Sequence, residues 1–235
     1  CLVGSEMCIR DSIVSALAAS DDVFFYAIGC DFWLQRSTYG LEPIQHYAQM
    51  YGLGGLTGVT LPGEFQGRVD SPTEREKLHR EYPSVYSSAW YPADNLEMAF
   101  GQGGTILTPI EIADAYATFA NGGTRYQPQI AADIVNANGR IVKTFQPVAT
   151  GHVPLPPLVR QTLLQGFQGA LQDPSLGTAG STFAGFPFNK MPLAGKTGTA
   201  TITHQLEPDS LFVAFGPTTH PQYVVCVVIS QAGFG

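Results

Sequence analysis

Apolar residues recur at helical spacing over much of the chain, and turn-forming residues separate these stretches. Residues 13–19 are apolar and rich in alanine, and Ser20-Asp21-Asp22 ends them with residues that favour turns and helix N-caps. Thr108-Pro-Ile-Glu111 has the residue types of a capping box, with a proline suited to the first helical position. The pattern predicts helices over residues 13–19, 23–36, 42–51, 108–122 and 156–172, a loop over 54–70, and nothing definite for 73–90.

Strand-like runs dominate the C-terminal third. Residues 193–202, 211–215 and 223–229 are separated by turn residues, and their short connections favour antiparallel pairing. Because 224–229 is continuously apolar, it predicts a strand covered on both faces. A separate hairpin is predicted from two apolar runs, 130–135 and 141–145, around Asn136-Ala-Asn-Gly139. Together these elements indicate an α/β protein of the α+β type, in which helices cover an antiparallel sheet.

Amino-acid composition and charge exclude several classes of protein. The 235 residues are 44% hydrophobic and only 13% charged, which excludes a disordered chain and a coiled coil. The net charge of −7 argues against a nucleic-acid partner. No apolar run approaches the length of a membrane span. The five histidines and four cysteines show no ligand spacing, so we expect no metal and no cofactor.

The first twelve residues stand apart from this pattern. They lack the basic stretch followed by an apolar stretch that a signal peptide requires. They resemble the translation of an adapter oligonucleotide used in library sequencing. We therefore interpret residues 1–12 as a sequencing-adapter scar and residues 13–235 as the folded part.

The sharpest chemical motif is Lys196-Thr197-Gly198, followed by Thr199, on a predicted strand. A lysine supplies a fixed cation, threonine hydroxyls can bind a carboxylate, and glycine leaves room for a ligand against the backbone. Strand alternation places Lys196 and Gly198 on one face and the two threonines on the other. An edge strand could still offer both sets to one ligand.

Two further stretches complete a resemblance to a known family. Ser20-Asp21-Asp22, which alone also fits a helix N-cap, lies where the penicillin-binding transpeptidases have Ser-x-Asn. The run from Asn95 to Gly104, with Leu107-Thr-Pro-Ile-Glu-Ile-Ala113 and Gly58-Val-Thr-Leu-Pro-Gly-Glu64, closely resembles that family's long signature. The match is closest to class B enzymes of the elongation type, and Ala117-Thr-Phe-Ala-Asn-Gly-Gly-Thr124 resembles actinobacterial members.

The resemblance implies a fold like that of serine β-lactamases and a serine acyl transfer between peptidoglycan stem peptides. In this family a serine of Ser-x-x-Lys attacks the D-Ala-D-Ala carbonyl, and β-lactams acylate the same serine. Carried over by motif, the catalytic residues are Ser20, Asp22 and Lys196, and the substrate-binding residues are Thr197, Gly198 and Thr199. Ser20 would move protons, and Lys196 would supply the cation. The N–H of Thr199 would be an oxyanion donor.

The chain departs from the family pattern in two ways. It has no correctly placed Ser-x-x-Lys, and it ends without the family's C-terminal helix, so we expect a partial domain that is inactive by itself. Asp22 stands where asparagine is commoner, although elongation-type enzymes tolerate aspartate there. The resemblance also implies a membrane anchor outside this chain, the extracytoplasmic face of the bacterial membrane, and partners in cell elongation. A non-catalytic β-lactam sensor, a wall-binding module, a DD-carboxypeptidase and a β-lactamase remain alternatives.

Overall fold

The computed structural model describes residues 12–201 and 206–233. The interpretation of residues 1–11 as a scar lies outside this part, whereas Ser12 belongs to it as the N-cap of the first helix. The helices are α1 (Ile13–Ala19), α2 (Asp22–Leu34), α3 (Arg36–Tyr39), α4 (Pro43–Met50), α5 (Pro72–Glu81), α6 (Pro92–Ala99), α7 (Pro109–Ala120) and α8 (Pro157–Gln172). The strands are β1 (Thr124–Tyr126), β2 (Asp133–Val135), β3 (Ile141–Thr144), β4 (Ala149–His152), β5 (Ala194–Ala200), β6 (Asp209–Gly216) and β7 (Tyr223–Ile229).

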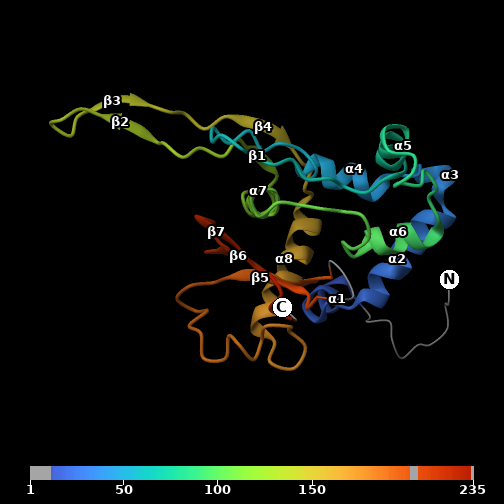
Figure 1. Ribbon diagram of the computed structural model, residues 1–235. Helices are drawn as coiled ribbons and strands as arrows, with labels where there is room; N and C mark the ends of the chain where they lie inside the picture. The colour runs from blue at the N-terminus through green and yellow to red at the C-terminus, as the bar shows by residue number, and fades with distance from the viewer. Residues whose placement is uncertain (1–11, 202–205, 234–235) are drawn as a thin grey trace.

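The three C-terminal strands form one antiparallel sheet in the order β5-β6-β7. Helix α8 packs against β5, and α7 packs against β6 and β7 (Figure 1). The core between helices and sheet is aromatic, since the ring of Phe119 lies 5.3 Å from that of Phe167 and 5.9 Å from that of Phe215. These ring pairs adopt the edge-to-face arrangement that favours aromatic contacts. The predicted class, helices covering an antiparallel sheet, is confirmed.

Each strand of this sheet turns alternate residues toward the helices. Ala194, Phe215 and Val224 are aligned across the three strands, and all three belong to the core or pack against it. By the same alternation, Lys196 lies on this helix-facing side of β5. The opposite face carries exposed Val225 and Ile229 on β7. The prediction that residues 224–229 are covered on both faces is therefore wrong, because the side chains on that side of β7 are exposed in the described part of the chain.

Helix α1 is placed by close packing on α8. A side chain at Gly166 of α8 would bring its Cβ to 2.7 Å from the Cβ of Leu17, so glycine is what allows the two helices to approach. Ala16 and Ala170 are fully buried. The end of α1, where Ser20 follows, is therefore fixed relative to α8 and to β5 beside it.

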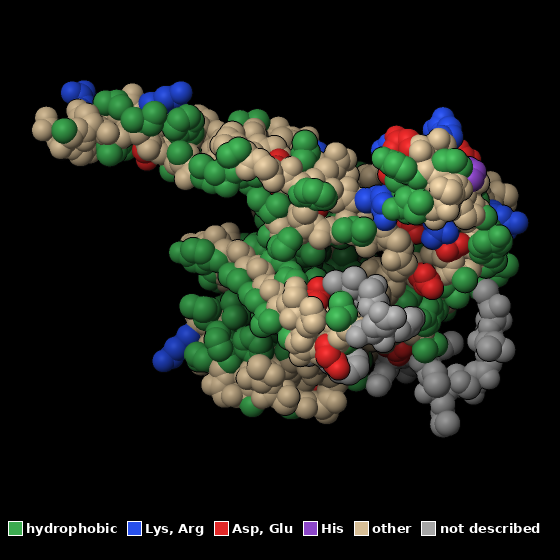
Figure 2. Space-filling model, viewed as in Figure 1, with side chains coloured by type: hydrophobic (Ala, Val, Ile, Leu, Met, Phe, Trp, Pro, Cys, Tyr) green, Lys and Arg blue, Asp and Glu red, His purple; other side chains and the backbone are tan. Residues whose placement is uncertain are grey.

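Two small antiparallel pairs lie away from this core. Strand β1 pairs with β4, and β2 pairs with β3 in a hairpin that projects from the body of the molecule (Figure 1). The hairpin exposes apolar side chains such as Val135, Ile141 and Val142, and hydrophobic side chains are visible along it in Figure 2. The sequence predicted β2 and β3 but not β1 and β4, which are only three and four residues long.

The five predicted helices are confirmed, with shifts of a residue or two at the ends. The capping box at Thr108 is present, since Thr108 Oγ1 accepts the N–H of Glu111 and Glu111 Oε2 accepts the N–H of Thr108. The unassigned stretch 73–90 contains α5, which begins at Ser71 as N-cap and Pro72. Within residues 12–201 and 206–233, no helix has the length and hydrophobicity of a membrane span, and no three metal-binding side chains gather.

Candidate active site

A cavity of about 680 Å³ lies beside β5, at the junction of α1 and α2 and next to the loop after α6. All six residues singled out in the sequence line it: Ser20, Asp22, Lys196, Thr197, Gly198 and Thr199. The fold thus brings residues 20–22 and 196–199, which are far apart in the sequence, to one place. Their chemical roles stay predictions, because proximity alone does not assign them.

Ser20 occupies the tight connection between α1 and α2. Its backbone is left-handed, with φ 55° and ψ 51°, and its N–H donates to the carbonyl of Leu17. Asp21, not Ser20, is the N-cap of α2, because its carboxylate accepts the N–H groups of Val23 and Phe24. The exposed side chain of Ser20 is therefore not needed to cap a helix, which leaves its hydroxyl for the cavity.

Lys196 is largely buried because of the face of β5 on which it lies. On the helix-facing side it is aligned with buried Val213 of β6. Burial disfavours the ammonium form and lowers the pKa of Lys196 to about 8, while the negative charge of Asp22 acts in the opposite direction. Its Nζ donates to the carbonyl of Thr197 at 3.0 Å. A lysine with this pKa is still mostly protonated at neutral pH.

Strand β5 has no partner strand on its cavity side within the described part of the sheet. The carbonyl of Thr199 accepts a hydrogen bond of 3.0 Å from Nε2 of Gln102, which lies in the loop after α6 and not in β6. In an extended strand the N–H and C=O of one residue point to the same side. The backbone N–H of Thr199 therefore also faces this open edge, as an oxyanion donor must.

Thr197 and Gly198 lie on opposite faces of the strand. Thr197 Oγ1 donates to Thr178 Oγ1 at 2.8 Å on the face opposite Lys196. A Cβ at Gly198 would come within 3.3 Å of the Cβ of Leu211, closer than most real contacts. The cavity thus wraps around an edge strand, which is how residues from both faces reach one space.

Sequence reasoning missed several residues of the cavity wall. Gln102 was part of a recognised stretch but had no assigned role, and Thr178 lies in a region with no motif. Phe25 and Phe100 line the apolar side, and Phe100 packs edge-to-face with Tyr26 at 4.7 Å. The one available signal concerned Phe25, which lies three residues after Asp22 on a predicted helix and therefore on the same helix face.

Comparisons with known proteins agree with this geometry. Residues 8–235 match the family described as "Penicillin binding protein transpeptidase domain". The chain is 26% identical over 257 residues to the peptidoglycan D,D-transpeptidase MrdA of Escherichia coli, covering 100% of this chain and 38% of that protein. It is 32% identical over 201 residues to penicillin-binding protein 2B of Streptococcus pneumoniae, covering 82% of this chain and 25% of that protein.

Solved structures show the same fold. PBP2 of Pseudomonas aeruginosa superposes with a TM-score of 0.72 at 27% identity, covering 94% of this chain and 45% of that one. A PBP2 of Helicobacter pylori, solved in complex with MreC, gives a TM-score of 0.70 at 25% identity, covering 93% of this chain and 36% of that one. The chain spans less than half the length of each of these relatives. With nearly all of its residues inside the match, the chain belongs to the penicillin-binding protein transpeptidase domain family, among relatives of the class B elongation type.

Proposed function

We propose that the protein containing this chain is a serine-type peptidoglycan DD-transpeptidase and a target of β-lactams. The observation that carries the proposal is the cavity in which Ser20, Asp22 and Lys196 meet the open edge of β5. A fixed cation, a hydroxyl and an aligned backbone N–H around one space are what acyl transfer requires. The relatives named as transpeptidases support the same activity.

The first step is acylation. The hydroxyl oxygen of a serine, expected upstream of this chain, bonds to the carbonyl carbon of the penultimate D-Ala of a stem peptide. The C–N bond to the terminal D-Ala breaks, and that amino acid leaves after its nitrogen takes up a proton. Ser20 is placed to pass this proton from the attacking serine to the leaving nitrogen, because its hydroxyl borders the cavity and is not committed to capping.

Strand β5 supplies binding and charge stabilisation. The ammonium group of Lys196 and the hydroxyls of Thr197 and Thr199 would hold the terminal carboxylate of the substrate. The Thr199 N–H would stabilise the oxyanion of the tetrahedral intermediate, for which loss of one donor typically costs about 100- to 1,000-fold. In the second step the amine nitrogen of another stem peptide bonds to the ester carbonyl carbon, the C–O bond to the serine breaks, and the serine oxygen takes up the proton that the amine loses.

The test uses the full-length protein with a fluorescent penicillin, followed by denaturing electrophoresis. We expect a stable label on the full-length protein and none on the 235-residue chain, which lacks a placed Ser-x-x-Lys. A donor stem peptide with an acceptor amine then separates the alternatives. Cross-linked product supports the transpeptidase, hydrolysed product alone supports a carboxypeptidase, rapid release of the penicillin supports a β-lactamase, and label without turnover supports a sensor.

We also propose that the full-length protein is anchored in the bacterial membrane, acts on its extracytoplasmic face and joins the cell-elongation machinery. The Helicobacter pylori relative solved with MreC supports a partner of that kind. Co-purification of the tagged full-length protein with the MreC homologue of its own cell would test this. If the protein is found in the membrane fraction but mild crosslinking does not link it to the MreC homologue, the proposed partner is wrong and only the proposed membrane anchor is supported.

A further inference from the structure

Gln102 is held in the cavity by a loop that is unusually well anchored. The N–H of Gly104 donates to Asp70 Oδ2 at 3.1 Å, and its carbonyl accepts from Nε and Nη2 of Arg68. A Cβ at Gly104 would lie 2.6 Å from Asp70 Oδ2, so the carboxylate sits directly against the backbone. Thr105 Oγ1 in turn accepts the N–H of Asp70. Gly104 is thus bound to Asp70, while Gln102, two residues earlier, is bound to Thr199 in the cavity wall.

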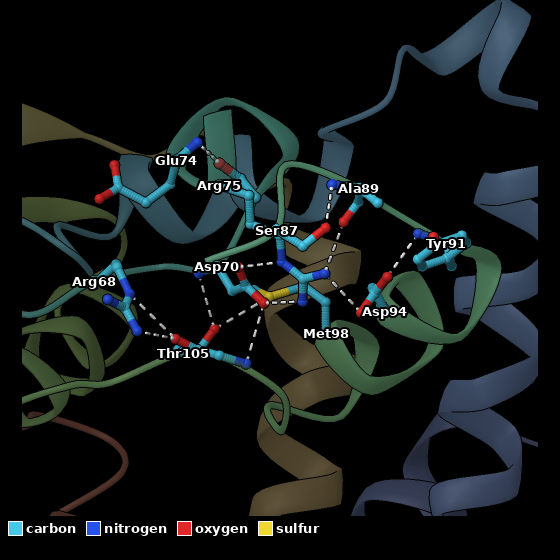
Figure 3. A network of polar contacts seen from close by, with 12 residues as sticks. Arg68, Asp70, Glu74, Arg75, Ser87, Ala89, Tyr91, Asp94, Met98 and Thr105 are labelled. Carbon is cyan, nitrogen blue, oxygen red and sulfur yellow. Dashed lines mark hydrogen bonds and ion pairs between the residues drawn. The ribbon is translucent and has the colours of Figure 1, made fainter. Parts of the chain in front are cut away.

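Asp70 is fixed by Arg75 of α5. The guanidinium donates from Nε to Oδ1 at 3.0 Å and from Nη2 to Oδ2 at 2.6 Å, a bidentate pair (Figure 3). Its Nη1 lies 2.9 Å from Asp94 Oδ1 and also donates to the carbonyl of Ala89. The side chain of Asp70 is only 8% exposed, so this pair is largely shielded from water. Bidentate geometry fixes direction as well as distance.

Arg75 is further restrained by stacking. Its guanidinium carbon lies 4.6 Å from the ring centroid of Trp90. Carboxylates on two sides and an aromatic face on another leave this side chain little freedom. We call Arg68, Asp70, Arg75, Asp94 and Thr105 the Arg75 network. None of the five lines the cavity beside β5, so the network touches no substrate in that space.

We propose that the Arg75 network is a positioning device for the active site, which acts through Gln102 on the backbone of Thr199 in β5. The inference rests on the proposed transpeptidase function. A displaced 101–105 loop would release the Gln102 amide from the Thr199 carbonyl. The open edge of β5 would then lose a contact that helps to orient Thr199, and the N–H of Thr199 would be held less firmly toward the oxyanion. Binding of the substrate carboxylate would change less, because we assign it to Lys196 and Thr197 as well as to the Thr199 hydroxyl.

The experiment is a double-mutant cycle in the full-length protein, followed by acylation with a fluorescent penicillin. Arg75→Lys keeps the charge but cannot form the bidentate pair. We expect the acylation rate constant to fall about 5- to 30-fold, with little change in the dissociation constant of the initial complex. In a Gln102→Ala background, Arg75→Lys should cause no further fall. The effect of Arg75→Lys on the melting temperature should be the same in both backgrounds, because the network stabilises the fold independently of the Gln102 side chain.

Lys77→Met on the same helix is the matched control, since the Lys77 side chain is exposed and its ion pair with Glu74 is a long one of 3.6 Å. We expect it to leave the acylation rate unchanged. An equal loss from Arg75→Lys in both backgrounds would show an effect independent of Gln102 and overturn the proposal. So would an unchanged rate in Arg75→Lys at a matched folded fraction.

Amide hydrogen exchange provides a readout that needs no ligand. Arg75→Lys should speed exchange in peptides covering the 101–105 loop and β5, and should leave α8 unchanged. Unchanged exchange in β5 would overturn the positioning role even if the protein were not acylated. If the unaltered protein takes up no penicillin, the transpeptidase proposal fails instead, so the two failures are distinguishable.

Discussion

Asp22 and Lys196 are far apart in the sequence, but they line one cavity, and the charge of Asp22 acts on the ammonium group of Lys196. Burial lowers the pKa of the lysine to about 8, and the aspartate limits that fall. This gives a physical role to the residue that departs from the family pattern. Asparagine would offer an amide donor, whereas Asp22 offers a charge that helps to keep Lys196 protonated. The aspartate thus favours the cationic form that the proposed chemistry needs.

A shift in pH dependence would test this role. The charged form of Lys196 is needed, so acylation of the full-length protein should fall as pH rises through about 8. Asp22→Asn removes the interaction that raises the pKa of Lys196, so the fall should move to lower pH. Asp31→Asn, an exposed change on the same helix, should not move it. Rate profiles between pH 6 and 10 that coincide for all three proteins would contradict the pairing.

Removing the Lys196 cation should lower the acylation rate far more than removing the Cys226 thiol, two strands away. We expect Lys196→Ala to lower the acylation rate of the full-length protein about 100- to 1,000-fold, because a preorganised charge stabilises the developing anion. Cys226 is half-buried on β7 and borders no part of the cavity. Cys226→Ala should cost roughly 1 kcal/mol of stability and leave acylation unchanged at a matched folded fraction. A normal rate in Lys196→Ala would make the Lys-Thr-Gly motif a coincidence.

Ser20 allows catalysis and stability to be separated. Its φ of 55° is one that glycine adopts without steric cost, so Ser20→Gly should leave the free energy of unfolding unchanged or raise it by up to about 1 kcal/mol. The same change removes the hydroxyl that we assign to proton transfer, and acylation should fall about 100- to 10,000-fold. Stopped-flow acylation and thermal melts of Ser20→Gly and Ser20→Ala would measure both. Retained acylation in the glycine variant would exclude Ser20 from proton transfer.

The elements with strong local signals were predictable from the sequence. The Thr108 capping box and the apolar strands gave correct helix and strand positions, because local hydrogen bonds and side-chain alternation decide them. Short β1 and β4 were not predictable, since each is stabilised by pairing with a strand more than twenty residues away. The exposed outer face of β7 was predicted wrongly, because an apolar run does not reveal which elements are present to cover it.

The site was predictable only where motifs mark it. Six residues could be named from two sequence stretches, and the structure brings them to one cavity. The roles of Gln102 and Thr178 depend on hydrogen bonds across the fold, to Thr199 and Thr197, which no periodicity or spacing encodes. The lowered pKa of Lys196 likewise depends on which face of β5 the helices cover. Tertiary packing, not local pattern, supplies the site's electrostatics.

Asp114 of α7 carries a prediction about stability that is independent of catalysis. It lines a second cavity of about 280 Å³, together with Thr57, Arg125 and Gln127. Burial raises the pKa of its carboxyl from 3.8 to about 6, and the nearby charge of Arg125 only partly opposes this. The folded state therefore holds a proton more tightly than the unfolded state. Stability contributed by this group is present below pH 3.8 and is lost as pH rises to about 6.

Asp114→Asn should remove that loss. At pH 7 we expect the variant to melt about 1–2 °C higher than the unaltered chain, a small effect because the carboxylate is only half-buried. The difference should disappear near pH 4, where Asp114 is itself largely protonated in the folded state. Glu76→Gln, an exposed change on α5, serves as the control and should shift the melting temperature at neither pH. A variant that melts lower than the unaltered chain at pH 7 would mean that Arg125 stabilises the Asp114 carboxylate more than burial destabilises it.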